Sequence, residues 1–96
     1  MFDIQIPGGG DATIKLVGRL DASQSDRALK VLSTLPGPVV ADCSELDYIS
    51  SAGIGVLLET YKRLHDEGHS FRLLNVPPRV KNVLTLANID RILGVE

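Results

Sequence analysis

Two adjacent serines, Ser50 and Ser51, are the side chains whose type and position could support chemistry in this chain. They precede apolar residues at helical spacing, which predict a helix beginning at the serines: Ile54, Leu57, Leu58, Tyr61 and Leu64. The first turn of a helix has unpaired backbone N–H groups and a partial positive charge, so a phosphate on a serine there is tolerated. The same phosphate adds about −1.5 to −2 charges, which would repel a partner docking there. The pattern permits a phosphorylation switch, but from spacing alone two ordinary capping serines are the commoner explanation.

Several small and acidic residues have roles that their places in the sequence suggest. Small residues in the first turn of the helix, Ala52, Gly53 and Gly55, leave the serine hydroxyls open to a partner. Asp21 follows the second predicted strand, where we expect it to cap the first helix. Asp42 is expected to order a loop by accepting hydrogen bonds from nearby backbone N–H groups, with an acid near the serine as the alternative.

The two histidines do not complete a catalytic or metal site in the sequence. His65 and His69 are four residues apart, but Gly68 between them is expected to end the helix, and no third ligand is nearby. A Ser-His-Asp triad would need a histidine beside Ser51, whereas the far end of the same helix lies about 20 Å away at 1.5 Å per residue. Cys43 is expected to be a small, partly buried hydrophobic residue. We therefore predict no metal, no cofactor and no catalytic activity.

The composition bounds the class of protein. The chain has 96 residues, 44% of them hydrophobic, which suffices for one core, so we expect a single domain over residues 1–96. The net charge of −2 and the small number of aromatic residues give no reason to expect nucleic-acid binding. One cysteine excludes an internal disulfide. Because we find no signal-peptide pattern and no apolar run near the roughly 18 residues of a membrane span, a cytoplasmic location without membrane insertion is expected.

The elements that must position the serines alternate along the chain. Alternating apolar residues predict strands over residues 2–6 and 12–16, joined by a turn at 8–11. Helical spacing predicts a helix over 23–35. The wholly apolar run at 39–41 predicts a strand covered on both faces, and therefore the middle of a sheet flanked by helices.

The second half of the chain repeats this alternation. Residues 42–51 are expected to form a loop that leads into the serine-capped helix, which ends near Gly68. A strand at 71–74, a helix opening at Pro77 and a last short strand at 92–95 complete the pattern. The order β-β-α-β-α-β-α-(β) predicts an α/β fold with a mixed, mainly parallel sheet of four to five strands packed with three main helices.

One stretch resembles the signature of a known family. The run from Asp42 to Leu58, which reads DCSELDYISSAGIGVLL, resembles the STAS domain of bacterial anti-sigma factor antagonists. Residues 16–21 resemble that family's second-strand exit, and residues 71–95 resemble its closing strand, helix and strand. The resemblance covers nearly the full chain and implies a single STAS-like domain.

The family resemblance also implies a phosphorylation site. The usual motif reads Asp-Ser-Ser/Thr-Gly before an apolar helix, and the serine after the aspartate is phosphorylated by an anti-sigma factor that is an ATP-dependent serine kinase. Aligned on Gly53, that serine is Ser51, with Ser50 as the second choice. Here Ser50 stands where the aspartate is most usual, and Ala52 stands where a second serine or threonine is most usual.

The function implied by the resemblance is partner switching that controls transcription by a sigma factor. The unphosphorylated protein would bind the anti-sigma factor serine kinase and release a sigma factor, and phosphorylation would abolish binding until a phosphatase of the PP2C type removed the phosphate. ATP would belong to the kinase, and the protein itself would be a monomer or weak dimer. The implied partner-binding residues are Asp21, Asp42, Ser44, Ser50, Ser51, Ala52, Gly53 and Ile54.

Two other functions stay open on the sequence. The departures at Ser50 and Ala52 leave room for a constitutive STAS scaffold, or for an accessory subunit of a transporter such as a lipid ABC system or of a signalling complex. An enzyme that uses Ser51 as a nucleophile is disfavoured, because neither a positioned base nor an oxyanion loop can be assigned.

Overall fold

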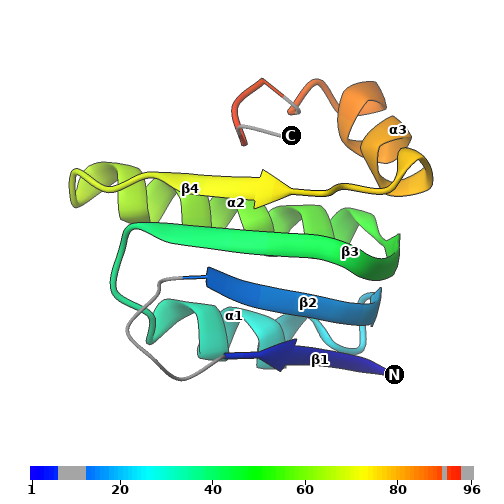
Figure 1. The fold of residues 1–96 in the computed structure, drawn as a ribbon, viewed down its shortest axis with the longest axis horizontal. Helices are drawn as coiled ribbons and strands as arrows, with labels where there is room; N and C mark the ends of the chain where they lie inside the picture. The colour runs from blue at the N-terminus through cyan, green and yellow to red at the C-terminus, as the bar shows by residue number, and fades with distance from the viewer. Residues whose placement is uncertain (7–12, 90, 94–96) are drawn as a thin grey trace.

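Four strands form one sheet whose spatial order follows the chain, β1-β2-β3-β4 (Figure 1). The computed structural model describes residues 1–6, 13–89 and 91–93. Strand β1 (Phe2–Gln5) pairs antiparallel with β2 (Thr13–Leu20), and β3 (Val39–Ile49) and β4 (Phe71–Leu74) are added in parallel. The mixed, mainly parallel sheet is therefore confirmed, with four strands. The turn predicted at 8–11 lies outside the described residues.

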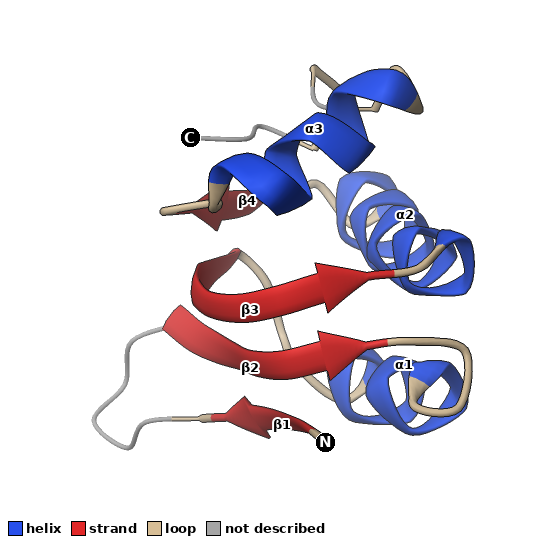
Figure 2. Ribbon diagram, turned by 90° about the vertical axis from the view of Figure 1, so that its right-hand side faces the viewer, coloured by secondary structure: helices blue, strands red, loops and turns tan. Residues whose placement is uncertain are grey.

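Two helices cover one face of this sheet. Helices α1 (Ser25–Ser33) and α2 (Ser51–Asp66) lie on the same side of the strands, at the right of Figure 2, and α3 (Pro78–Leu86) lies near β4. Successive parallel strands joined by crossovers of one hand place both connecting helices on the same face. The element order β-β-α-β-α-β-α is confirmed. In the described part of the chain no helix is both long and apolar enough to cross a membrane.

The core is aliphatic, as the composition requires. It lies between the sheet and the helices, and no polar side-chain atom buried in the described residues lacks a hydrogen-bond partner. The largest fully buried side chains come from every layer of the fold: Leu16, Leu20, Leu32, Leu46, Leu57, Leu64, Leu73, Leu84 and Leu93.

Strand β3 is much longer than predicted, and this corrects the expected loop over residues 42–51. Its buried residues Cys43, Leu46 and Ile49 are three apart rather than two, which conceals the strand periodicity in the sequence. The pairing explains the spacing. Register shifts between Lys15 and Val17 and between Gly18 and Arg19 each place one extra β3 residue against β2. Two bulges thus keep β3 paired to its end while its buried residues face the core.

The predicted last strand is wrong for the part that the structure describes. Residues 91–93 form a turn, and the Leu93 N–H donates to the Ile89 carbonyl at 3.0 Å, as in a single helical turn. Leu93 is fully buried, so the segment packs into the core without extending the sheet. Val95 lies outside the described residues.

Candidate functional site

Ser50 joins the start of α2 to the end of β2. It is the N-cap of α2, in an extended conformation, and its Oγ accepts a hydrogen bond from the Gly53 N–H at 3.1 Å. The same hydroxyl donates to the Leu20 carbonyl at 3.3 Å, and the Ser50 N–H donates to that carbonyl at 3.0 Å. One carbonyl at the end of β2 therefore accepts two hydrogen bonds from the residue that begins the helix.

Gly53 allows this close approach between α2 and β2. A Cβ atom at position 53 would lie 2.6 Å from the Leu20 carbonyl oxygen and 2.9 Å from Cγ1 of Ile49, closer than real Cβ atoms come. Because Asp21 directly follows Leu20, the contact brings Asp21 to the same end of the sheet as the serines. The structure thus groups three of the predicted partner-binding residues, Asp21, Ser50 and Gly53.

Ser51 is the accessible serine of the pair. It is the first residue of α2 and is exposed, and its hydroxyl makes no hydrogen bond to any described residue. Ala52 beside it is also exposed, whereas Ile54 is half-buried and packs against the core. The hydroxyl of Ser50 thus links the start of α2 to the end of β2, whereas the hydroxyl of Ser51 is accessible and makes no hydrogen bond within the described residues.

Replacing each serine by alanine should separate these two roles. Ser50→Ala removes the N-cap acceptor, so we expect it to lower the free energy of unfolding by about 1 kcal/mol. Ser51→Ala, the matched control, removes no hydrogen bond within the described residues and should change it by less than about 0.5 kcal/mol. Urea denaturation of both variants measures the difference, and equal effects would contradict the assignment.

Asp21 is held in the turn before α1 and does not cap that helix as predicted. The N-cap of α1 is Gln24, which makes no side-chain capping bond. Asp21 Oδ1 instead accepts from the Ser23 N–H at 3.1 Å and the Ser23 hydroxyl at 2.7 Å. The hydroxyl bond is the main cause that holds the pKa of Asp21 below its ordinary value. The Asp21 carboxylate is therefore oriented by Ser23 within the turn before α1, at the end of the sheet where α2 begins.

Asp42 lies away from the serines, in the middle of the sheet. It pairs with Lys15 on one side and Leu74 on the other, roughly 20 Å before the end of β3 at about 3.3 Å per residue. Its Oδ1 accepts from the Ser44 N–H at 2.9 Å, within the first bulge, which is the main cause of a lowered Asp42 pKa. The expectation that Asp42 binds nearby backbone N–H groups is confirmed, but it orders a strand rather than a loop.

Ser44 is also separated from the serine pair. It is exposed and lines a depression of about 330 Å³ between β3 and the start of α3, together with Asp47 and Arg79. Both Ser44 and Asp47 fall where β3 carries its extra residues. The partner-binding residues predicted from the sequence thus divide into a group at the start of α2 and a second group, Asp42 and Ser44, within β3.

Sequence reasoning missed two side chains at the serine end of the sheet. Arg19 and Tyr48 are register partners near the ends of β2 and β3, and the Arg19 guanidinium carbon lies 4.3 Å from the centre of the Tyr48 ring. Tyr48 is 38% exposed, so part of this pair is accessible at the surface. A signal was available, since an arginine and a tyrosine precede the two strand ends, but pairing them required the bulged register.

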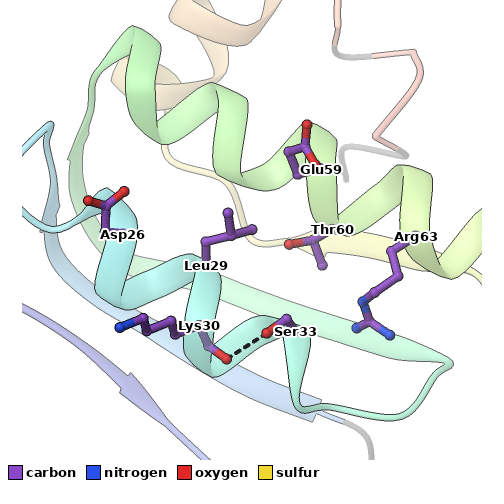
Figure 3. A pocket seen from close by; sticks show the side chains of 7 residues that line it. All are labelled: Asp26, Leu29, Lys30, Ser33, Glu59, Thr60 and Arg63. Atoms are coloured by element: carbon purple, nitrogen blue, oxygen red, sulfur yellow. Dashed lines mark hydrogen bonds between the residues drawn. The ribbon is translucent and has the colours of Figure 1, made fainter.

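A groove of about 500 Å³ runs between α1 and α2 (Figure 3). It is lined by Leu29 and by charged or polar side chains from both helices, none of which belongs to the predicted site. Arg63 reaches across it and donates to the carbonyls of Leu32 and Leu35 at 3.0 and 2.9 Å, at the end of α1. The groove is thus a helix-packing feature tied by Arg63, separate from the serine end.

Cys43 is more deeply buried than predicted. It is fully enclosed in the core, and burial raises the pKa of its thiol to about 12. The thiol is therefore protonated and shielded near neutral pH. We expect iodoacetamide to leave the folded protein unlabelled and to label it in urea, as measured by mass spectrometry. Rapid stoichiometric labelling of the folded protein would contradict this burial.

The fold and the junction at Ser50 define a small α/β domain that presents a helix N-terminus at one end of a mixed sheet. The family model described as "Mlab, STAS domain" matches residues 7–94. Because this match spans nearly the whole sequence, the chain belongs to the STAS domain family, as the resemblance implied.

Solved structures of the same fold include anti-sigma factor antagonists. A Thermotoga maritima protein proposed as one is 24% identical, covering 98% of this chain and 84% of that chain, with a TM-score of 0.78. An antagonist from Mycobacterium paratuberculosis is 20% identical over 97% of this chain and 85% of its own, with a TM-score of 0.75. The Bacillus cell fate determinant SpoIIAA in its phosphorylated form is 17% identical over 100% and 89%, with a TM-score of 0.73. At these identities the likeness establishes the fold.

Proposed function

We propose that this protein is an anti-sigma factor antagonist, a binding module without catalysis of its own that is switched by phosphorylation of Ser51. The observation that carries the proposal is the exposed Ser51 hydroxyl, which has no hydrogen-bond partner among the described residues and stands at the start of α2. Structures of the same fold that are named anti-sigma factor antagonists, among them SpoIIAA, which is also known in a phosphorylated form, support this choice.

A phosphate on Ser51 would change the surface and leave the fold intact. The α2 cap depends on the Ser50 hydroxyl, not on Ser51, and a helix N-terminus accommodates negative charge. About −1.5 to −2 charges would then stand near the half-buried Ile54, at the end of the sheet where Asp21 also lies. A partner that docks on this end would have to desolvate those charges, so phosphorylation opposes binding.

The proposed partner is an anti-sigma factor that is a serine kinase. The unphosphorylated protein binds the kinase and frees a sigma factor for transcription, and a PP2C-type phosphatase restores binding after phosphorylation. ATP is bound by the kinase, so this chain needs no cofactor. In this function the protein works in the cytoplasm as a monomer or weak dimer.

Phosphate mapping tests the proposal directly. The protein is incubated with ATP and the serine-kinase anti-sigma factor of the same genome, and mass spectrometry locates the phosphate. We expect modification of Ser51, loss of modification in Ser51→Ala, and retained modification in Ser50→Ala. Absence of both a complex and a modification would overturn the proposal, and a phosphate on Ser50 would overturn the choice of residue.

Binding measurements test the charge mechanism. Ser51→Asp places a carboxylate at the docking end and should weaken the complex with the kinase by roughly tenfold, whereas Ser51→Ala should bind like the parent protein. An unchanged affinity for the aspartate variant would argue against a switch that works through charge.

A second candidate function is a constitutive accessory subunit of a transporter, such as a lipid ABC system, or of a signalling complex. Two observations favour it: the matching family model is described as Mlab, and Ser50 replaces the aspartate most usual in antagonists. The Ser50 hydroxyl donates to Leu20, which an ionised carboxylate cannot do. Genes for a kinase and a sigma factor beside this one would favour the antagonist, and transporter genes would favour the subunit.

A further inference from the structure

Both histidines of the chain line one depression at the far end of α2. The depression has a volume of about 470 Å³ and is formed by the last turns of α2, the start of β4 and the turn after α3. His65 lies fourteen residues after Ser51, about 21 Å along the helix at 1.5 Å per residue. The lining residues are Tyr61, His65, Gly68, His69, Ser70, Phe71, Arg91 and Ile92.

One side of the depression is formed by a stacked pair of aromatic rings. The rings of Tyr61 and His65 are stacked, with centroids 5.5 Å apart and planes 15° from parallel. Phe71 lies beneath, buried in the core, and Ile92 is 47% exposed at the rim. Stacked planar rings next to an apolar floor offer a ligand ring the same offset arrangement that aromatic side chains adopt with one another.

The rest of the depression carries hydrogen-bond donors and no acidic side chain among its lining residues. Arg91 makes no hydrogen bond or ion pair within the described part of the chain. Two carbonyls at the end of α2 accept backbone hydrogen bonds: Gly68 N–H donates to His65 at 3.0 Å, and His69 N–H donates to Leu64 at 2.7 Å. The side chains of His69, Ser70 and Arg91 make no hydrogen bond within the described residues, so their donors are available to a ligand.

The chain reversal that gathers these groups depends on Gly68. Its φ of +82° lies in the left-handed region, which lets the chain turn back directly after α2. The turn places His69 and Ser70 beside the last turn of α2, so the donors and the ring stack face one space.

We propose that this depression binds a small ligand in which a planar aromatic ring carries a carboxylate or a phosphate. The ring extends the stack from the outer face of the Tyr61–His65 pair, and Arg91 pairs with the oxyanion, with His69 as a second donor. The volume lies within the range of small-molecule sites, about 300 to 1,000 Å³. This site is independent of the switch proposed at Ser51, so either function can hold without the other.

Titration of the full chain with four probes tests the site and separates its two ligand sources. Indole-3-acetate presents a ring with a carboxylate, and phenyl phosphate presents a ring with a phosphate. Indole and inorganic phosphate are the controls that lack one of the two features. We expect saturable shifts of the His65 and His69 ring resonances with at least one ring-bearing anion, and at least tenfold weaker binding of both controls.

Substitutions then assign the contacts. Arg91→Gln should weaken binding of the ring-bearing anion about tenfold, because a charge-assisted pair is lost. Tyr61→Leu should weaken it through loss of the ring stack. Arg79→Gln is the matched control, since Arg79 is an exposed arginine outside this depression. Dispersed amide spectra of each variant show that it has folded.

Three results would overturn the inference. One is the absence of saturable shifts at His65 and His69 with either ring-bearing anion. The other is binding that folded Arg91→Gln and Tyr61→Leu leave unchanged, which would place the ligand elsewhere. Binding of indole as tightly as indole-3-acetate would also overturn it, because the oxyanion would then contribute nothing.

Discussion

Replacing Gly53 with alanine is expected to lower the free energy of unfolding by about 2 kcal/mol, as for other overpacked sites. The new Cβ would lie 2.6 Å from the Leu20 carbonyl oxygen and 2.9 Å from Cγ of Leu20. That oxygen belongs to backbone and already accepts two hydrogen bonds from Ser50, so it cannot yield without disturbing the N-cap. Either the helix start must shift or the capping geometry must be lost.

Gly55 provides the matched control for this prediction. It lies in the same helix, and a Cβ there would meet nothing within 4 Å. Alanine is the better helix former, so Gly55→Ala should raise the free energy of unfolding by roughly 0.5 to 1 kcal/mol. Urea denaturation of both variants measures whether each substitution lowers or raises the free energy of unfolding. A stabilising Gly53→Ala would show that the junction is looser than described.

Gly18→Ala should have an effect of similar or greater size, about 2 to 4 kcal/mol, because conformational strain and a backbone clash act together. Gly18 has a φ of +95°, and a Cβ there would lie 2.3 Å from the Met1 carbonyl oxygen. That carbonyl accepts the Arg19 N–H at 2.8 Å and so helps to hold β1 on the sheet. The clash should also loosen the pairing of β1 with β2.

Comparison with Gly68→Ala separates the effect of backbone strain at a positive φ from the effect of the clash with Met1. Gly68 also has a positive φ, +82°, but a Cβ there meets nothing within 4 Å. Its substitution should therefore cost only the conformational strain, about 1 to 2 kcal/mol. Thermal unfolding compares the two variants, and hydrogen exchange at the Arg19 amide reports on β1. If Gly18→Ala lowers the free energy of unfolding no more than Gly68→Ala does, the contact with Met1 does not constrain the fold.

The sequence alone predicted the type of those elements whose buried residues recur at a regular spacing. The α2 stripe from Ile54 to Leu64 and the alternation around Ile14 predicted the right element types, because helices and unbroken strands repeat their buried positions. The part of strand β3 beyond Ala41 was not predicted, because its bulges change the spacing of its buried residues from two to three. The segment near Leu93 was wrongly predicted as a strand, because a buried apolar residue can belong to a strand or to a turn.

The candidate site was predictable where it depends on local sequence. Ser50 as N-cap and the open position of Ser51 follow from a serine pair placed before an apolar helix. The contact of Ser50 with Leu20 joins residues thirty positions apart, and it depends on which strands are neighbours. The separation of Asp42 from Ser51 depends on the length of β3, which the sequence pattern conceals.

The two bulges in β3 also predict where single-residue deletions can be accommodated in this fold. From residue 40 to residue 49, β3 runs beside residues 13–20 of β2, so it holds two residues more than the strand it follows. Loss of Ser44 or Asp47 would straighten the strand while Cys43, Leu46 and Ile49 still faced the core. Single-residue gaps in related sequences are therefore expected at these two positions, and the serine pair would keep its place against Leu20 in chains that carry them.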